Sequence, residues 1–491
     1  MGVVAGIDSS TQSCTVELRD ALTGVLIGQG RAPHPPTYPP ISEQPAHAWW
    51  QALVVALGAA VSAAGISGRE IDAVSVAAQC HGLVMLDASG ELLRDVKLWN
   101  DTTSAPQATA MVELLGAATW ADAVGSVPTA AFTITKLAWV AEREPHLLTR
   151  LAQVMLPHDY LTFRLTGRAV TDRSEASGTG YYAAHEGRWR YDLLDRLVSP
   201  DVDWPAVLPV VLEPGEPAGQ VTRAAAEVLG LRPDVVVGPG AGDQHAGALG
   251  IGMAPGEVLY SLGTSGVVIS VSPDPVHDPT GWVDGVADAA GGYLPLVCTL
   301  NATKVTDTIG RILGVDHTEL ARLALAAPVD EERPTLAAFL DGERSPDRPR
   351  ATGLLGGLTT ATTREGLALS AYEGVLLGLL RGHDAIRAAG ATADGAVLVA
   401  GGGARSAAYR QVLADLLGAP VYTRDAPEAT ARGACIQAAA VLSRADIGTV
   451  RDSWTPPTTS TTIPRAAVPD AVRERYLALA EDRTFDNEGI A

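Results

Sequence analysis

One pattern occurs twice in this chain, and it constrains the fold more than any other feature of the sequence. Two apolar segments, residues 3–7 and 15–19, flank a loop of Gly, Ser and Thr near residue 10. Residues 256–271 repeat this design, with small residues at the turn near residue 264. Apolar strands joined by tight turns of small residues are typical of β-hairpins. We therefore predict an internal duplication in which each hairpin begins one domain, residues 1–248 and 249–491.

Strand-like and helix-like segments alternate along the rest of the chain, which indicates an α/β architecture. Residues 363–389 carry apolar side chains at a spacing of three to four, as in a helix with one buried face. Two proline-containing stretches predict irregular structure, a surface loop at 31–45 and a linker at 452–464. The other expected elements are helices at 46–64, 407–417 and 470–482 and strands at 71–77, 235–237 and 397–400.

Charge and cysteine content narrow the functional classes. The 491-residue chain has a net charge of −20, which argues against binding to a nucleic-acid backbone. Its four cysteines lie far apart without zinc-finger or CxxC spacing, and such sparse thiols are typical of a reducing cytosol. The longest apolar stretch, residues 52–64, is interrupted by Gly58 and is shorter than the roughly 20 residues of a membrane span. We expect a soluble cytoplasmic protein with no nucleic-acid or membrane partner.

Three loops of small residues have the composition of phosphate-binding loops. In the first, Asp8 ends an apolar strand and is followed by Ser10 and Thr11, so backbone N–H groups and hydroxyls can converge on one phosphate. A carboxylate beside a phosphate is repulsive unless a cation lies between them, which makes Asp8 a candidate Mg²⁺ ligand. The second loop is 261–266, and the third, 401–403, precedes a helix. Taken singly, each loop also suits an ordinary turn, with Asp8 as a turn cap.

Asp243 is the candidate general base. It follows the strand-like residues 235–237 within a glycine-rich segment, 238–247. The glycines allow a substrate hydroxyl and a phosphate to approach the carboxylate, which can then accept the hydroxyl proton during phosphoryl transfer. The alternative is a turn aspartate satisfied by local N–H groups. His245, two residues on, is better interpreted as a structural or supporting histidine.

Ten short blocks resemble, in order, those of the FGGY carbohydrate kinase family and extend through nearly the whole chain. Each block is short, but ten in sequence make chance agreement implausible. The blocks are residues 8–13, 43–50, 79–82, 98–101, 135–139, 157–161, 171–179, 242–243, 262–266 and 402–404.

The resemblance implies two actin-like (ribonuclease H-like) domains with a nucleotide cleft between them, ATP and Mg²⁺ in the cleft, and the sugar held mainly by the first domain. By this analogy Asp243 is the catalytic base, and Asp8 and Asp243 lie at the metal. For Cys80 the alternative is a small buried hydrophobe, and for His81 a core histidine. The implied sugar-binding residues are Gln79, Cys80, His81, Asp101 and Asp243, and the implied nucleotide-binding residues are Ser10, Thr11, Gly263, Thr264, Gly402, Gly403 and Ala404.

Within the family, blocks 79–82 and 171–179 look most like those of the xylulokinases. The implied reaction transfers the γ-phosphate of ATP to a ketopentose, most simply D-xylulose, giving D-xylulose 5-phosphate. Two alternatives stay open. One is a kinase for another sugar or polyol such as ribulose, a hexulose, gluconate or glycerol, and the other is a non-catalytic sugar- or nucleotide-binding relative. Similar enzymes are commonly homodimers, and the sequence leaves the oligomeric state open.

Two positions depart from the family's pattern. The first loop usually carries Lys or Arg where this chain has Thr15, and Thr103 stands where an Arg usually follows block 98–101. At Thr15 the loss removes a cation expected near the γ-phosphate, where positive charge stabilises the transition state. The candidates for replacing these charges are Lys97, Lys136 and Lys304. The departures bear on turnover and sugar identity, and they leave the fold expectation unchanged.

Overall fold

The two predicted hairpins are the first strands of two sheets that share one topology. The computed structural model describes residues 2–328, 333–484 and 486. In the first sheet, β1 (Val3–Ser9) pairs antiparallel with β2 (Ser13–Asp20) and parallel with β5 (Ile71–Ala78). The strand order of this sheet is β13-β14-β5-β1-β2-β3, which adds β3 (Leu26–Pro33), β13 (Gly219–Gln220) and β14 (Val236–Val237), with β15 (Ala241–Gly242) also paired to β5.

The second sheet repeats this arrangement. Strand β16 (Val258–Leu262) pairs antiparallel with β17 (Gly266–Ser270) and parallel with β21 (Val397–Ala400). Strands β1, β2, β3 and β5 thus correspond to β16, β17, β18 and β21, and the predicted duplication and α/β class are confirmed. The order is β18-β17-β16-β21-β22-β23, which adds β18 (Leu296–Thr299), β22 (Val421–Arg424) and β23 (Thr458–Thr462).

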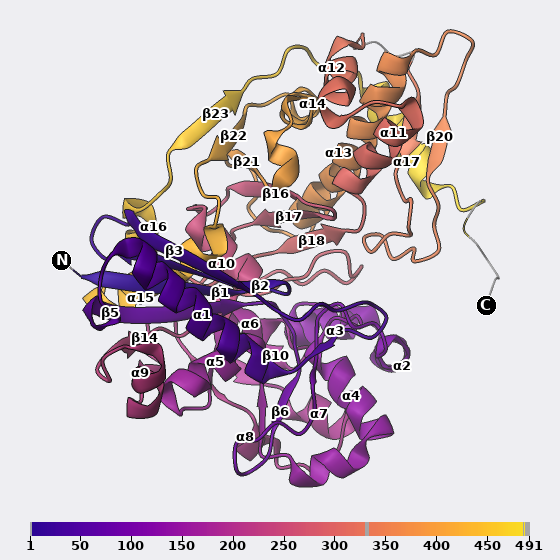
Figure 1. Ribbon diagram of the computed structural model, residues 1–491. Coiled ribbons are helices and arrows are strands. Elements are labelled where there is room, and N and C mark those ends of the chain that lie inside the picture. Colours follow the sequence, from indigo (N-terminus) through magenta and orange to yellow (C-terminus); the bar gives the residue numbers. More distant parts are fainter. Residues whose placement is uncertain (1, 329–332, 485, 487–491) are drawn as a thin grey trace.

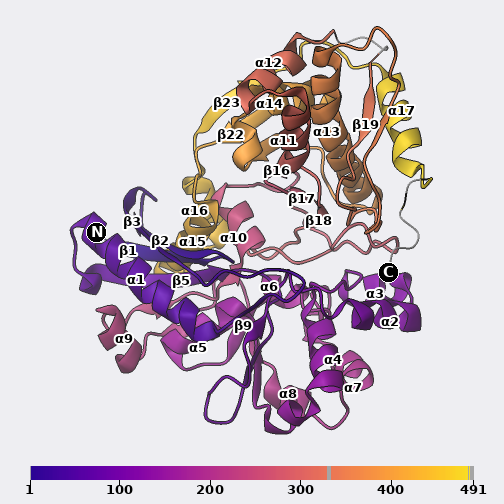
Figure 2. The same cartoon turned by 45° about the vertical axis from the view of Figure 1, so that its right-hand side comes forward.

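Helices cover both sheets, and Figures 1 and 2 show the two halves one above the other. Helix α1 (Ala46–Ala64) packs on β2 and β3. By length and composition it could cross a membrane, but its buried side chains, including Trp49 and Leu53, belong to the core of the first half. The core of the second half surrounds α13 (Arg364–Ala388), and the N-cap of this helix, Thr363, accepts a hydrogen bond from the Gly366 N–H.

A helical lobe is inserted after β5 and has an apolar core of its own, which includes Trp120, Phe132 and Trp204. Its helices are α2 (Ala105–Leu115), α3 (Ala117–Val124), α4 (Thr133–Arg143), α7 (Tyr191–Leu197) and α8 (Trp204–Val207). Helix α5 (Pro157–Thr166) packs on β5 and belongs to the core of the first half, and α6 (Arg173–Ser177) lies beside β15. The remaining helices are α9 (Arg223–Leu229) in the first half and α11 (Thr303–Leu313), α12 (His317–Ala326), α14 (Ala407–Leu417) and α17 (Asp470–Glu481) in the second.

Two helices join the halves. Helix α15 (Ala429–Ser443) follows β22 of the second sheet in sequence, yet it packs on β1 and β5 of the first and against α10 (Asp243–Gly250). Figure 1 shows α15 and α16 (Ile447–Ser453) beside the first sheet. Glycine permits this contact, because a Cβ at Gly433 would lie only 2.7 Å from the Ala246 carbonyl carbon. The predicted division at residues 248 and 249 stays a prediction.

Two irregular segments were predicted wrongly. Residues 458–462 of the expected linker form β23, which pairs antiparallel with β22, because a run of Thr and Ser suits an extended edge strand. Within the expected surface loop 31–45, residues 31–33 belong to β3, and Ser42 and Gln44 are fully buried. The Gln44 side chain donates to the carbonyls of Thr11 and Pro35, so this segment fastens the first phosphate loop.

Candidate active site

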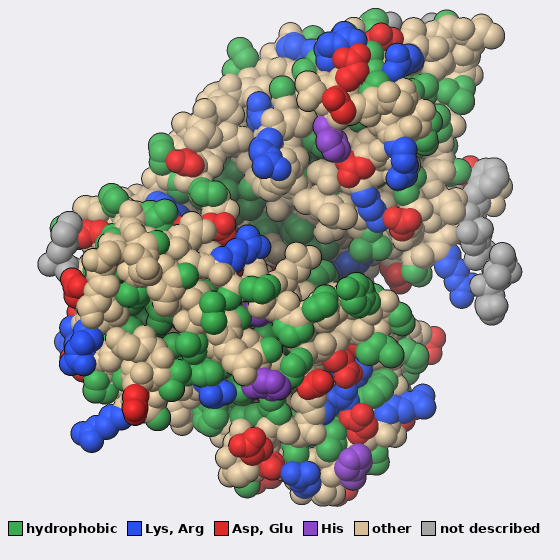
Figure 3. Space-filling model, in the orientation of Figure 1, with side chains coloured by type: hydrophobic (Ala, Val, Ile, Leu, Met, Phe, Trp, Pro, Cys, Tyr) green, Lys and Arg blue, Asp and Glu red, His purple; other side chains and the backbone are tan. Residues whose placement is uncertain are grey.

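The candidate site lies between the two sheets. A cavity of about 380 Å³ is lined from the first half by Asp8, Ser10 and the start of α10, and from the second half by β16, β17, Gly401 and the residues before α15. Figure 3 shows the hollow between the two halves. Parallel strands β1, β5 and β15 end at this edge of the first sheet, with Asp8 opposite Ala77 and Ala77 opposite Ala241. Loops after parallel strands are common ligand-binding positions in α/β proteins, and here they bring Asp8 and Asp243 to one cavity.

Asp243 begins helix α10. One of its carboxylate oxygens, Oδ1, accepts from the Gln244 N–H at 2.8 Å and lies 3.3 Å from Cys80 Sγ, which donates to it. Burial raises the pKa of this carboxyl, and the hydrogen bonds from Cys80 and Gln244 oppose the rise. A base with a raised pKa is better matched to proton abstraction near neutral pH, so the geometry suits the predicted role.

Asp8 faces the same cavity from the end of β1. Its Oδ1 accepts a hydrogen bond from Ser10 Oγ at 2.6 Å. Burial raises the pKa of Asp8 to about 7, and the neighbouring carboxylates of Asp243 and Glu428 add to the rise. Carboxylates facing one space repel each other and favour a divalent cation between them. Asp8 and Asp243 are therefore candidate ligands for Mg²⁺, which prefers hard oxygen donors.

A buried polar cluster lies beneath Asp243. The ligand atoms of Cys80, Glu175 and His245 lie within 4.8 Å of one another. A Cβ at Gly242 would lie 2.6 Å from His245 Nδ1 and 2.8 Å from Cys80 Sγ, so only glycine fits before Asp243. Burial raises the pKa of Glu175 to about 8. Thiol and imidazole ligands suit softer metals than Mg²⁺, which separates this cluster from the proposed magnesium position.

The predicted sugar residues 79–81 follow β5 and lie beside Asp243. Gln79 is buried, and its amide nitrogen lies 3.4 Å from Gln44 Oε1. His81 has a left-handed backbone conformation, with φ at 63°, and its N–H donates to Glu175. Its imidazole stacks on Phe132 at 5.2 Å between ring centroids and keeps 18% of its side-chain surface exposed. A stacked, partly open imidazole beside the base suits recognition of a hydroxylated ligand.

Asp101 is fully buried and organises the backbone around it. Its Oδ2 accepts from the Ser42 N–H at 2.9 Å, and its Oδ1 accepts from the Thr103 N–H at 3.0 Å. The ammonium of Lys97 lies 3.3 Å from Asp101 Oδ1 and donates to Thr103 Oγ1 at 2.8 Å. The structure thus places the Lys97 ammonium at Thr103, where it also pairs with Glu43 at 3.0 Å.

The other two candidate cations are engaged elsewhere. Lys136 is buried, donates to the carbonyls of His81 and Ala131, and has its pKa lowered to about 7 by burial. Lys304 Nζ pairs with the Asp341 carboxylate at 2.8 Å, at the surface.

The nucleotide residues predicted from the resemblance lie at three turns, and of these residues only Ser10 is among the described residues that line the cavity. Ser10 lines it directly, and Thr11 receives a hydrogen bond from the Trp99 indole at 2.9 Å. Gly263 and Thr264 form the turn between β16 and β17, and their carbonyls accept from the backbone at the start of α11. Gly401 lines the cavity. Gly402, Gly403 and Ala404 follow in a 3₁₀ turn, residues Gly402–Arg405, that packs on Leu262.

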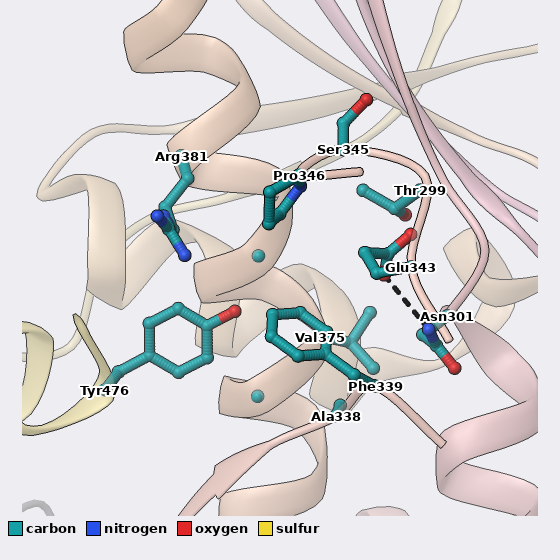
Figure 4. Close-up of a pocket in the computed structure, with 12 residues that line it drawn as sticks. Thr299, Asn301, Ala338, Phe339, Glu343, Ser345, Pro346, Val375, Arg381 and Tyr476 are labelled. Carbon is teal, nitrogen blue, oxygen red and sulfur yellow. Dashed lines mark hydrogen bonds between the residues drawn. The ribbon is translucent and has the colours of Figure 1, made fainter. Parts of the chain in front are cut away.

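A second enclosed space lies beside α13 in the second half. Figure 4 shows Phe339, Arg381 and Tyr476 around it, with Asn301 donating to Glu343. Its volume is about 10 Å³, which is room for one water molecule. It is too small for a nucleotide or a sugar.

Sequence reasoning missed several residues of the site. Glu175 was quoted only as part of block 171–179, although it holds the His81 backbone and abuts Cys80. Glu428 lines the cavity from the loop before α15. It lies far from Asp8 in sequence, and no local pattern marks it. Arg31 faces the Asp8 side of the sheet, which only the strand register reveals.

Comparison with known proteins places the chain in a family. The N-terminal domain model of the FGGY family of carbohydrate kinases matches residues 3–250, and the C-terminal domain model matches 258–442. The chain is 44% identical to the xylulose kinase of Streptomyces coelicolor over 92% of this chain and 90% of that protein. It is 32% identical to the xylulose kinase of Haemophilus influenzae over 88% and 89%. The crystal structure of xylulose kinase from Bifidobacterium adolescentis superposes with a TM-score of 0.86 at 38% identity, covering 96% of this chain and 99% of that one. The chain belongs to the FGGY family of carbohydrate kinases.

Proposed function

We propose that this protein transfers the γ-phosphoryl group of ATP to D-xylulose and forms D-xylulose 5-phosphate. The observation that carries the proposal is the convergence of Asp8 and Asp243 on one cavity between the two halves, beside three turns of small residues. The relatives named xylulose kinase, which align with most of the chain, support the choice of sugar.

Asp243 is the general base in this mechanism. Its carboxylate accepts the proton of the attacking hydroxyl as the new P–O bond forms and the bond to the ADP oxygen breaks. Cys80 and the Gln244 N–H hold Oδ1 in place, so the second carboxylate oxygen remains for the substrate. The N-terminus of α10 stabilises negative charge on the base before the proton arrives.

Asp8 and Asp243 fit a magnesium ion, since two carboxylates face the cavity and burial disfavours both charges without a cation. When bound, Mg²⁺ would offset the negative charge of the phosphates. The backbone N–H groups at Ser10 and Gly402 would hold phosphate oxygens, whereas the Gly263 N–H donates to the Ser265 carbonyl within its own turn. The rigid pairing of β1 with β2 and of β16 with β17 keeps the two hairpin turns in position.

Residues 79–81 and the inserted lobe form the proposed sugar side. A polyol is recognised by hydrogen bonds, because a mismatched hydroxyl leaves buried polar groups without partners. The buried Oε1 of Gln79 has no hydrogen-bond partner among the described residues, and it can pair with a sugar hydroxyl.

Product analysis on a sugar panel tests the proposal. ADP formation from Mg-ATP would be followed with D-xylulose, ribulose, fructose, gluconate and glycerol, and the phosphorylated carbon would be identified by phosphorus NMR. We expect D-xylulose to give the highest kcat/KM and phosphate at O5. His81→Gln should raise the KM for xylulose, whereas His47→Gln, on the exposed face of α1, should not. A different preferred sugar would keep the chemistry and overturn the choice of substrate.

We extend the proposal to the cytoplasm and to a homodimer. The free thiols Cys14, Cys80, Cys298 and Cys435 accord with a reducing compartment. Fractionation and sedimentation velocity measure the two properties directly.

A further inference from the structure

The proposed nucleotide cavity is strongly acidic. Asp8, Asp243 and Glu428 line it, and no Lys or Arg lines it among the residues that the structure describes. A nucleotide triphosphate brings further negative charge, and the transferred phosphoryl group keeps that charge in the transition state. One divalent cation does not balance this set of charges, so a protein cation at the rim would contribute to both binding and turnover.

Strand register puts one arginine on the correct face of the sheet. Asp8 in β1 is opposite Thr15 in β2, and Thr15 is opposite Arg31 in β3. Residues directly opposite each other in antiparallel strands project from the same face. The neighbouring Gly30 packs against α1 on the other face, where a Cβ would lie 2.5 Å from the Ala60 nitrogen. Arg31 therefore projects from the face that carries Asp8.

The Arg31 guanidinium is held near the first phosphate loop and is otherwise available. Its Nε donates to Ser13 Oγ at 3.0 Å, and Ser13 is the first residue after the loop. Neither terminal nitrogen has a partner among the described residues. The charge is close enough to Asp8 to favour the ionised form of that carboxylate. Thr15 lies between Asp8 and Arg31 in the sheet, and its side chain is short. The long Arg31 side chain can therefore extend over it.

Arg19 in β2 projects from the same face of the sheet as Arg31, but its guanidinium is already engaged. Arg19 Nε lies 2.8 Å from Glu17 Oε2, and its Nη1 donates to the Gly24 carbonyl at 2.7 Å. Arg19 also lies four residue pairs further from the loop than Thr15, toward the far end of the sheet.

We propose that Arg31 extends over Thr15 and binds the γ-phosphate of the nucleotide, as the catalytic cation of the first phosphate loop. The proposal rests on the proposed kinase function. During transfer the sugar oxygen bonds to the γ-phosphorus, the bond from that phosphorus to the β–γ bridging oxygen breaks, and the hydroxyl proton passes to Asp243. Arg31 keeps its proton and binds the transferred group through its two terminal nitrogens, in the bidentate geometry that guanidinium shares with phosphate.

Three variants test the proposal. Arg31→Gln removes the charge, and Arg31→Lys keeps it. Thr15→Lys combined with Arg31→Gln moves the charge by one strand toward Asp8. Arg143→Gln is the matched control, since Arg143 is exposed on α4 and, among the residues that the structure describes, forms an ion pair only with Glu142. Thermal unfolding verifies that each variant is folded.

We expect Arg31→Gln to lower kcat about 10- to 100-fold, somewhat less than the loss of a fully buried oxyanion donor. It should weaken Mg-ATP binding and leave Mg-ADP binding unchanged, because ADP lacks the γ-phosphate. Arg31→Lys and the double variant should recover most of the lost rate. An Arg31→Gln protein that binds Mg-ATP normally and retains kcat within about twofold of the Arg143→Gln control would overturn the proposal. The nucleotide titrations also decide the matter if no sugar is phosphorylated, since they require no turnover. Failure of the kinase function is therefore distinguishable from failure of this assignment.

Discussion

The contact between α10 and α15 offers a prediction whose magnitude follows from the structure. Gly433 in α15 faces Ala246 in α10, where a Cβ would overlap the carbonyl oxygen and lie 2.7 Å from the carbonyl carbon. Ordinary contact begins near 3.4 Å, so Gly433→Ala forces the helices apart by roughly 1 Å or more. Asp243 lies three residues before Ala246, within one helical turn. The displacement should therefore reach the base.

The free-energy change has two opposing parts. Overpacking at a rigid backbone contact costs about 1–3 kcal/mol, and replacing glycine by alanine inside a helix recovers up to about 1 kcal/mol. We expect a net destabilisation of about 1–2 kcal/mol and a loss of kcat of about 100-fold, because catalytic groups tolerate little displacement. Denaturant unfolding and steady-state ADP formation measure the two effects.

Gly58→Ala is the matched control. Gly58 lies inside helix α1, and a Cβ there meets nothing within 4 Å. The same substitution should stabilise the protein by about 0.5–1 kcal/mol and leave kcat unchanged. If Gly433→Ala were as stable and as active as Gly58→Ala, the close approach of α10 and α15 would not position Asp243, and the reasoning would be refuted.

Two further predictions concern charge. Lys97→Met removes the ammonium that pairs with the buried Asp101 and should lower the free energy of unfolding in urea by about 3–5 kcal/mol. Lys304→Met, which removes a surface ion pair, should lower it by less than about 1 kcal/mol. Equal effects of the two substitutions would contradict a stabilising role for the buried pair. Because the pKa of Asp8 is raised to about 7, protons compete with Mg²⁺ below that pH, and calorimetric Mg²⁺ affinity should fall about tenfold per pH unit there and level off above it. Glu428→Gln removes a charge that raises this pKa, so the break should move to lower pH; an unmoved break would count against the assignment of Asp8.

Much of the fold was predictable because local patterns carry it. The two hairpins, α13 and α14 follow from apolar periodicity and turn residues, and the structure confirms them. Strand β23 was missed because Thr and Pro near a strand read as a linker until the partner strand β22 is known. The buried Gln44 was missed because its hydrogen bonds run to distant segments.

The same distinction between local patterns and long-range contacts applies to the residues of the candidate site. Asp8 and Asp243 could be chosen as candidates from the sequence because each ends or follows a strand among small residues; the structure brings both to one cavity, and their roles stay predictions. Arg31 and Glu428 were not predictable. Arg31 is related to Asp8 only through the register of the sheet, and Glu428 reaches the cavity only because the segment before α15 folds back toward the first half. Lys97 was one of three candidate replacement cations, and only the structure shows that it alone reaches Thr103.

The most direct test of the central claim is the single-turnover rate of Asp243→Asn with D-xylulose and Mg-ATP, measured alongside xylulose affinity. The substitution preserves the size of the side chain, and the new amide oxygen can still accept hydrogen bonds from Gln244 and Cys80. It removes the carboxylate that accepts the proton. The account predicts a rate loss of roughly 1,000-fold with xylulose affinity within about threefold of the wild type. A rate within tenfold of the wild type would show that another group accepts the proton, and the assignment of the site to Asp243 would be wrong.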